Sequence, residues 1–166
     1  LCDAGVDWIT IHGRTRTTRS SYPANFEAIK YIVKGIRDKG VPVIANGDCF
    51  RKKDLQRITD LTGVDGVMAV RGLLSNPALF SGHDVCPWGC LELFVHYTLE
   101  YGGLPYQLLQ HHLYCMLENM QLKKSLLKQM MTMKNTPELL DWFDKHFTLK
   151  RSGELGFSEQ IDIPYK

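Results

Sequence analysis

The chain has 166 residues, of which 44% are hydrophobic and 23% charged, and its formal net charge is +2 at pH 7. This length allows one ordinary domain with a hydrophobic core. So small a net charge excludes a chain that is basic throughout, and any surface for a polyanion must therefore be local.

The first residue and the cysteines indicate whether the chain is a fragment and in which compartment it lies. The first residue is Leu1, not Met, and we expect a fragment of a longer protein. No signal peptide pattern begins the chain, and no apolar run approaches the roughly 20 residues that cross a bilayer. The 5 cysteines are irregularly spaced, which favours reduced thiols. We expect a cytoplasmic location and no membrane partner. A nuclear or mitochondrial location stays open, as does the oligomeric state.

The first part of the chain alternates strand and helix patterns. Apolar runs predict strands at 8–12, 41–45 and 64–70. Amphipathic stretches predict helices at 25–38 and 51–62, with Ile32 and Leu61 among the residues turned inward. This β-α-β-α-β order predicts parallel strands with right-handed crossovers, in an open α/β sheet or a barrel.

Beyond this part the pattern becomes helical. The sequence predicts helices at 88–101, 105–120, 121–134 and 137–147. We therefore expect an α/β domain over 1–82, a helical domain over 83–148 and a loose, irregular tail over 149–166.

Each predicted strand ends in glycine and polar residues. These ends are His12-Gly13-Arg14, Asn46-Gly47-Asp48 and Arg71-Gly72. Ligands of parallel α/β folds bind at the carboxyl ends of the strands. Glycine lets the backbone approach a ligand, so the last two ends together predict a phosphate-binding site. The alternative is that each glycine only makes a tight turn.

Three arginines follow His12 within one loop: Arg14, Arg16 and Arg19. Arginines this close repel one another unless an anion or water relieves them. The loop is therefore either solvated or in contact with the phosphates of a flavin or an RNA. His12 alone is more typical of a structural residue than of a catalyst.

The three strand-end strings, in this order and spacing, resemble the tRNA-dihydrouridine synthase family. The stretch Arg71-Gly72-Leu73-Leu74-Ser75-Asn76-Pro77 is similar to its eukaryotic type-4 branch. The resemblance is strong over residues 2–82, fainter to about 147, and ends before the tail. It implies strands 6–8 of a TIM (β/α)8 barrel followed by an all-α helical domain. The segment that would carry the catalytic cysteine, after the fourth strand, has no counterpart here.

The resemblance also implies a function. The enzyme would reduce the uridine C5–C6 bond in tRNA with FMN and NADPH, after flipping out the base. His12 would contact the flavin or the uracil, and the FMN phosphate would lie among Asn46, Gly47, Asp48, Arg71 and Gly72. Contacts to tRNA would come from Arg14, Arg16, Arg19, Lys123, Lys124 and Lys128, although the lysines otherwise read as a solvated helix face.

Two other functions stay open. One is a different FMN-dependent TIM-barrel oxidoreductase that acts on a small molecule. The other is a non-catalytic, RNA-binding barrel remnant. Because three strands cannot close an eight-stranded barrel, we expect the chain alone neither to retain flavin nor to make dihydrouridine.

Three further features of the sequence bear on the site: Cys49, Val70 and a group of cysteines and histidines. Cys49 follows Asp48 and reads as a small apolar filler. Val70 stands where the family tends to have glycine or alanine, and could crowd the phosphate. A zinc site is suggested by His83, Cys86, Cys90 and His96, but the C-x3-C spacing is unusual and no second cysteine pair follows, so we expect no metal.

Overall fold

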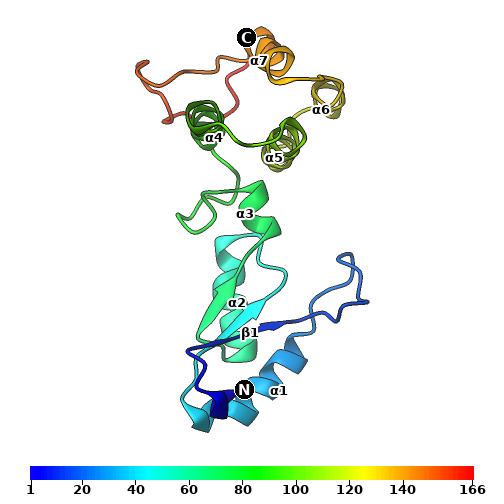
Figure 1. Cartoon of the computed structure of the whole chain (residues 1–166), viewed down its shortest axis with the longest axis vertical. Helices are drawn as coiled ribbons and strands as arrows, with labels where there is room; N and C mark the ends of the chain where they lie inside the picture. The colour runs from blue at the N-terminus through cyan, green and yellow to red at the C-terminus, as the bar shows by residue number, and fades with distance from the viewer. The chain divides into compact units, whose positions relative to one another are not determined.

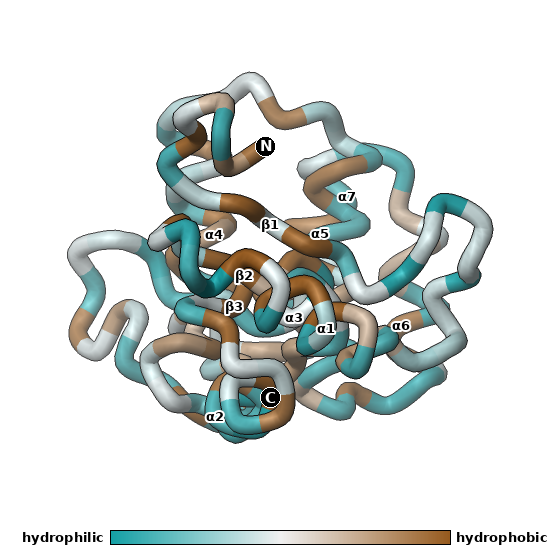
Figure 2. Tube along the Cα trace, turned by 90° about the horizontal axis from the view of Figure 1, so that it is seen from below, coloured by the Kyte–Doolittle hydropathy of each residue, from teal (hydrophilic) through white to brown (hydrophobic).

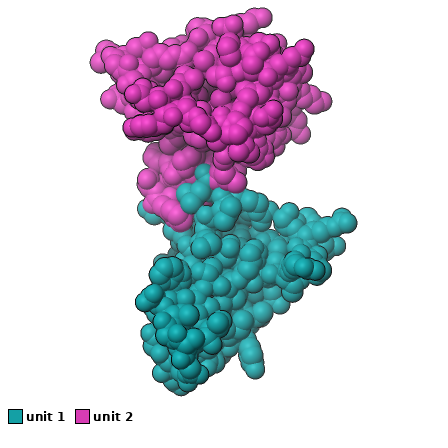
Figure 3. Space-filling model, in the orientation of Figure 1, with its two compact units in different colours: residues 1–73 teal, residues 74–166 magenta.

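The computed structural model describes residues 1–166 and divides them into two compact units. Unit 1 comprises Leu1–Leu73 and unit 2 comprises Leu74–Lys166 (Figure 3). Unit 1 contains the strands, and unit 2 contains the four longer helices of the second half (Figure 1).

Unit 1 is built on a parallel sheet with strand order β1-β2-β3. The strands are β1 (Ile9–His12), β2 (Val43–Asn46) and β3 (Gly66–Met68), and a short 3-10 helix, η1 (Cys2–Ala4), precedes them. Ile9 pairs with Val43, and Ile44 pairs with Gly66. The predicted β-α-β-α-β order is confirmed, and neighbouring parallel strands joined by helices are compatible with part of a (β/α)8 barrel.

Capping residues set the ends of the two crossover helices. In α1 (Phe26–Ile36), the Asn25 side chain accepts from the Ala28 N–H at 2.9 Å and caps the start. The 3-10 turn η2 (Arg37–Lys39) follows. In α2 (Lys52–Thr62), the Asp54 carboxylate accepts from the Arg51 N–H at 2.9 Å. Gly63 ends α2 at φ 75, a left-handed conformation that glycine adopts readily.

The inward faces of these helices are narrower than the sequence predicts. Ile29 and Val33 of α1 and Ile58 of α2 are buried, but Ile32 is 39% exposed and Leu61 is 41% exposed. Thr62 takes the buried place near the end of α2, where its hydroxyl donates to the Ile58 carbonyl at 2.6 Å. The predicted inward position of Ile32 and Leu61 is therefore wrong. Strands β1 and β2 consist largely of hydrophobic residues (Figure 2).

The third strand is shorter than its predicted range, because only Gly66–Met68 pairs with β2. A five-residue helix that the sequence did not predict, α3 (Arg71–Ser75), begins soon after it.

Unit 2 contains α4 (Trp88–Tyr101), α5 (Tyr106–Asn119), α6 (Lys124–Met130) and α7 (Thr136–His146). Three of these match their predicted ranges closely. The exception is α6, predicted over 121–134: Gln121 has φ 61, a left-handed backbone, so α5 ends before it and α6 starts later.

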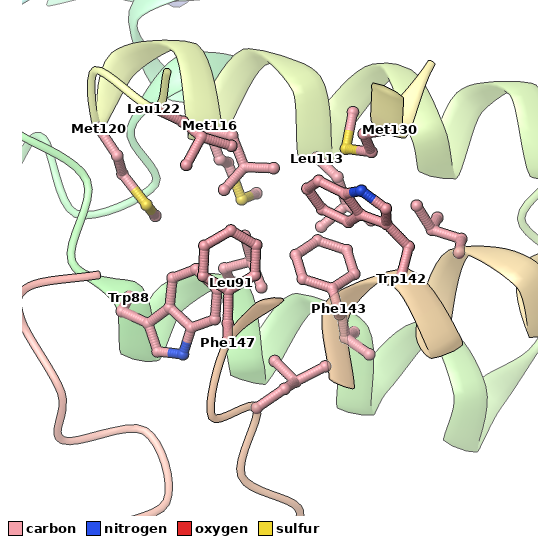
Figure 4. Packing of buried hydrophobic residues seen from close by; sticks show 14 of the residues in the cluster. Trp88, Leu91, Leu113, Met116, Met120, Leu122, Met130, Trp142, Phe143 and Phe147 are labelled. Carbon is pink, nitrogen blue, oxygen red and sulfur yellow. The ribbon is translucent and has the colours of Figure 1, made fainter. Parts of the chain in front are cut away.

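The core of unit 2 is rich in aromatic side chains (Figure 4). Trp88, Phe143 and Phe147 are completely buried. The ring centroids of Trp88 and Phe147 lie 5.2 Å apart, and those of Trp142 and Phe143 lie 5.1 Å apart in an edge-to-face arrangement. Such pairs add to the stabilisation from buried area.

The last residues, 149–166, are irregular but not loose. Glu92, buried in α4, accepts hydrogen bonds from the backbone N–H of Lys150 at 3.0 Å and of Ser158 at 2.8 Å. Its carboxylate also accepts from the Trp88 indole at 3.1 Å. Tyr165 forms an isolated antiparallel bridge with Phe147. The expectation of a loose tail was wrong, because hydrogen bonds to a buried carboxylate are invisible in local sequence.

No helix combines the length and the apolar character needed to span a membrane.

Candidate ligand-binding site

The carboxyl ends of the three strands in unit 1 enclose one cavity of about 230 Å³. It brings together all the residues that the sequence analysis placed around a cofactor, namely His12, Asn46, Gly47, Asp48, Arg71 and Gly72. Typical small-molecule pockets measure about 300–1,000 Å³. The cavity therefore suits one part of a ligand, such as a phosphate group.

Asp48 sits at the centre of the charges in this cavity. Its Oδ1 atom accepts hydrogen bonds from Nη2 of Arg14 and, at 3.2 Å, from Nη2 of Arg71. Its Oδ2 atom accepts from the backbone N–H of Ala24 at 2.7 Å. Two guanidinium groups and one carboxylate leave the cluster with one net positive charge, which favours an anion.

The two arginines differ in exposure. The Arg14 side chain is 6% exposed, and it also donates to the Tyr22 carbonyl at 2.7 Å. The Arg71 side chain is 46% exposed and lies over the Phe50 ring, 5.1 Å from its centroid. The Arg14 side chain is therefore occupied by contacts within the protein, whereas the more exposed Arg71 side chain has N–H groups that can donate to a ligand.

These neighbours also set the charge of Asp48. Burial raises the pKa of this carboxyl, but the hydrogen bonds from Arg14 and Ala24 and the charges of Arg14 and Arg71 lower it by more. The pKa of Asp48 lies below its ordinary value, so the carboxylate is ionised at neutral pH and holds both arginines.

At Gly47, which lines the cavity, the backbone passes close to Ala24. Its φ is 138, and a Cβ atom built there would lie 2.9 Å from the Cβ of Ala24. Both the backbone angle and the close approach require glycine. Ala24, which touches both Gly47 and Asp48, was missed by sequence reasoning, because nothing marks an alanine as part of a distant site.

His12 is exposed at the end of β1, and its Nδ1 accepts from the backbone N–H of Arg14 at 3.0 Å. The neutral ring therefore carries its proton on Nε2. This tautomer leaves an N–H that can donate to a ligand in the cavity.

A second, open hollow of about 440 Å³ adjoins His12 and is lined by Arg14, Arg16 and Arg71. Arg19 is exposed but does not line this hollow. The structure thus brings two of the three loop arginines, Arg14 and Arg16, to the same surface.

Cys49 and Val70 also line the cavity. Cys49 is 3% exposed, and burial raises the pKa of its thiol, with the charge of Asp54 adding to the effect. Burial of this kind suits a filler more than a nucleophile. Val70 is 54% exposed, so part of its side chain faces solvent.

In unit 2, Lys123, Lys124 and Lys128 line one open groove of about 780 Å³. Tyr114 and Met131 lie in the same groove. The predicted tRNA-contacting lysines thus share one surface with an aromatic ring. The structure contains no group of three or more His, Cys, Asp or Glu side chains arranged to hold a metal ion.

A parallel α/β sheet with a cavity at its carboxyl edge is typical of the barrel and open-sheet classes of protein, which bind their ligands at this edge. The family model described as dihydrouridine synthase matches residues 1–162. The chain belongs to the dihydrouridine synthase family.

Curated relatives agree with this assignment. The chain is 70% identical over 166 residues to a Saccharomyces cerevisiae protein named tRNA-dihydrouridine(20a/20b) synthase (NAD(P)+), covering 100% of this chain and 45% of that protein. A Schizosaccharomyces pombe protein of the same name is 39% identical over 158 residues, covering 95% of this chain and 47% of that protein. A human protein named as similar to this synthase is 36% identical over 143 residues, covering 86% of this chain and 43% of that protein. The chain spans about half the length of these relatives.

The comparisons correct one expectation. The family match reaches residue 162, and the identity to the S. cerevisiae protein extends over the whole chain. The tail was expected to fall outside the resemblance, because it lacks motifs that can be recognised by eye.

Proposed function

We propose that the chain supplies strands 6–8 of an FMN-binding (β/α)8 barrel, and the tRNA-contacting helices, of an FMN- and NADPH-dependent tRNA-dihydrouridine synthase. One observation carries the proposal: His12, Gly47 and Arg71, from three separate strand ends, line one cavity. The names of the relatives support the tRNA substrate and the nicotinamide cofactor. We assign the activity to a protein of the relatives' length.

The residues present fit the phosphate of FMN. Arg71 would donate to the phosphate oxygens, and Gly47 would let the backbone approach them. Asp48 would act through the arginines, since both its oxygens already accept hydrogen bonds. We therefore assign Asp48 a positioning role and not direct contact with the anion.

When bound, FMN would supply the redox chemistry by which NADPH reduces the C5–C6 bond of uridine. His12 would orient the reacting groups by donating from Nε2 to a flavin or uracil oxygen. Its other nitrogen is held by the Arg14 N–H, which fixes the plane of the ring.

Two surfaces would contact tRNA. Arg16 lies in the exposed loop beside His12 in unit 1, and the three lysines line a groove in unit 2. Tyr114 in that groove offers a face on which an unpaired base could stack. Binding through these residues would weaken as salt rises.

A chimera tests this function. The matched segment of the S. cerevisiae relative is replaced by this chain, to which it is 70% identical. The chimera is then expressed in yeast lacking that relative, and dihydrouridine in the tRNA is measured by mass spectrometry. We expect the missing dihydrouridine to return.

The other outcomes are distinct. A soluble chimera that retains flavin and oxidises NADPH without forming dihydrouridine would favour a small-molecule oxidoreductase. A soluble chimera that binds tRNA but no flavin would favour a non-catalytic RNA-binding protein. Either result would refute the proposed activity.

A further inference from the structure

Ala24 lies in unit 1, where the loop after β1 meets the loop after β2. It is the residue before the N-cap Asn25 of α1, and it is 7% exposed. A Cβ atom built on Gly13 would lie 2.8 Å from the Ala24 methyl carbon, and one built on Gly47 would lie 2.9 Å from it. Contacts under 3.0 Å are too short for a Cβ atom, so the Ala24 methyl group fills the space that a side chain would need at both glycines.

The two glycines are required for different reasons. Gly47 has φ 138, a backbone conformation that side chains disfavour whatever the space around it. The backbone of Gly13 has no left-handed φ, and the nearest atom that a Cβ would meet there is the Ala24 methyl carbon. Ala24 is therefore the main reason that position 13 needs glycine.

Hydrogen bonds hold Ala24 against these glycines. Its backbone N–H donates to Oδ2 of Asp48 at 2.7 Å. The N–H of the next residue, Asn25, donates to the Gly13 carbonyl at 2.6 Å, and the Gly13 N–H donates to the Asn46 carbonyl of β2 at 2.9 Å. The Ala24 methyl group therefore cannot move away from the two glycines without lengthening the hydrogen bonds beside it.

Ala24 reaches the charges of the cavity only through Asp48. The Ala24 side chain lines neither the cavity nor the hollow that adjoins it. The Ala24 N–H holds one oxygen of the Asp48 carboxylate, and the other oxygen accepts from Arg14 and Arg71. A shift of Ala24 would therefore turn the carboxylate and move both guanidinium groups.

We propose that Ala24 is a positioning residue for the phosphate of the bound flavin. Its methyl group sets the spacing of two strand-end loops, and its N–H sets the orientation of the Asp48 carboxylate. The inference rests on the proposed function, in which the anion of this cavity is the phosphate of FMN. A side chain larger than alanine at position 24 would push Gly13 and Gly47 apart and misplace the guanidinium groups.

Ala24→Val in the yeast chimera tests this role through the affinities for FMN and for riboflavin, which lacks the phosphate. Both affinities are measured by titrating the flavin-free chimera and following the quenching of flavin fluorescence. Misplacement by about 1 Å can cost up to about 100-fold, so we expect FMN binding to weaken by about ten-fold or more. The affinity for riboflavin should stay unchanged. A residue with only a structural role would instead weaken the binding of both flavins equally.

Ala28→Val is the matched control for this substitution. Ala28 is exposed on α1, so the same added methyl groups meet solvent there. The ratio of the FMN affinity to the riboflavin affinity in Ala28→Val should equal that of the unmodified chimera.

A second set of variants moves the methyl group across the contact. Gly13→Ala places a Cβ atom against the Ala24 methyl carbon, whereas Ala24→Gly removes that methyl group and keeps the backbone N–H. The double variant carries one methyl group at the contact, as the unmodified chain does, and should be more stable than Gly13→Ala alone. Urea titration of the 166-residue chain measures this double-mutant cycle without any flavin.

The outcomes separate this inference from the function on which it rests. An unmodified chimera that binds riboflavin as tightly as FMN would refute a phosphate site in the cavity, and the role of Ala24 with it. A chimera that prefers FMN, and keeps the same preference in Ala24→Val, would overturn the role of Ala24 alone. Additive effects of Gly13→Ala and Ala24→Gly on stability would overturn it as well.

Discussion

Asp48 and Arg14 form a largely buried ion pair that joins the loop after β2 to the loop after β1, with side chains 18% and 6% exposed. Because the same carboxylate reaches Arg71, one acidic residue fixes the positions of two arginines from different strand ends. Asp48 lies beside a proposed anion site because its carboxylate holds the two arginines in place.

Replacement of Asp48 by asparagine should destabilise unit 1. An amide cannot neutralise two guanidinium groups, and Arg14 would be left buried without its counter-charge. We expect a loss of about 2 kcal/mol in the free energy of unfolding, measured by urea titration. Asp60→Asn is the matched control, since Asp60 is exposed on α2 and bonds only Gln56, at 2.7 Å. Equal losses in the two variants would show that the ion pair contributes nothing.

Acid should remove the same contribution. The folded pKa of Asp48 lies below its ordinary value, so its stabilising effect is present at neutral pH and is lost as pH falls through the folded pKa, below about 4. The difference in unfolding free energy between the unmodified chain and Asp48→Asn should therefore shrink as the pH falls below about 4. A difference that stays constant over this range would contradict the assigned charge.

Gly47→Ala should disturb the cavity, whereas Gly35→Ala should not. At Gly47 the new methyl group meets Ala24 at 2.9 Å and the backbone has φ 138, but at Gly35 nothing lies within 4 Å. We expect Gly47→Ala to cost about 1–3 kcal/mol. Gly35→Ala, within α1, should instead stabilise by about 0.5–1 kcal/mol. Thermal unfolding of both variants gives the comparison. Equal shifts in the unfolding temperature would show that position 47 does not require glycine.

Glu92→Gln should release the tail. A glutamine side chain has one acceptor oxygen, but the N–H groups of Lys150 and Ser158 and the Trp88 indole all donate to the two carboxylate oxygens of Glu92. Unsatisfied buried donors cost about 1–3 kcal/mol each. We expect faster tryptic cleavage at Lys150 and Arg151. The control is Glu100→Gln, an exposed position on the same helix, and cleavage at equal rates in both variants would show that Glu92 does not hold the tail.

Much of the fold follows from local patterns. Asn25, Gly40 and Gly63 mark the boundaries of the helices, and apolar runs mark the strands, because capping and burial act on neighbouring residues. The short β3 and the late start of α6 could not be predicted in this way. The limits of β3 depend on pairing with β2, and those of α6 depend on the left-handed backbone of Gln121.

The residues that line the cavity could be predicted from the sequence, but the hydrogen bonds among them could not. Glycines and charged residues at strand ends identify the residues, since parallel strands end at the same edge. The bonds from Arg14 and Arg71 to Asp48 span 34 and 23 residues of sequence. No local pattern reports such contacts, so the hydrogen bonds of Asp48 to the two arginines could not be predicted from the sequence.

Retention of FMN by the yeast chimera tests the central claim most directly, with Arg71→Ala compared with Arg57→Ala. The two arginines are matched, since each side chain is 46% exposed, pairs with an aspartate and lies over a phenylalanine ring, but only Arg71 lines the cavity. Loss of a charged contact worth about 1.5–3 kcal/mol should weaken FMN binding by about 10- to 100-fold in Arg71→Ala. Arg57→Ala should bind FMN as the unmodified chimera does. An Arg71→Ala chimera that keeps its flavin unchanged would contradict the account.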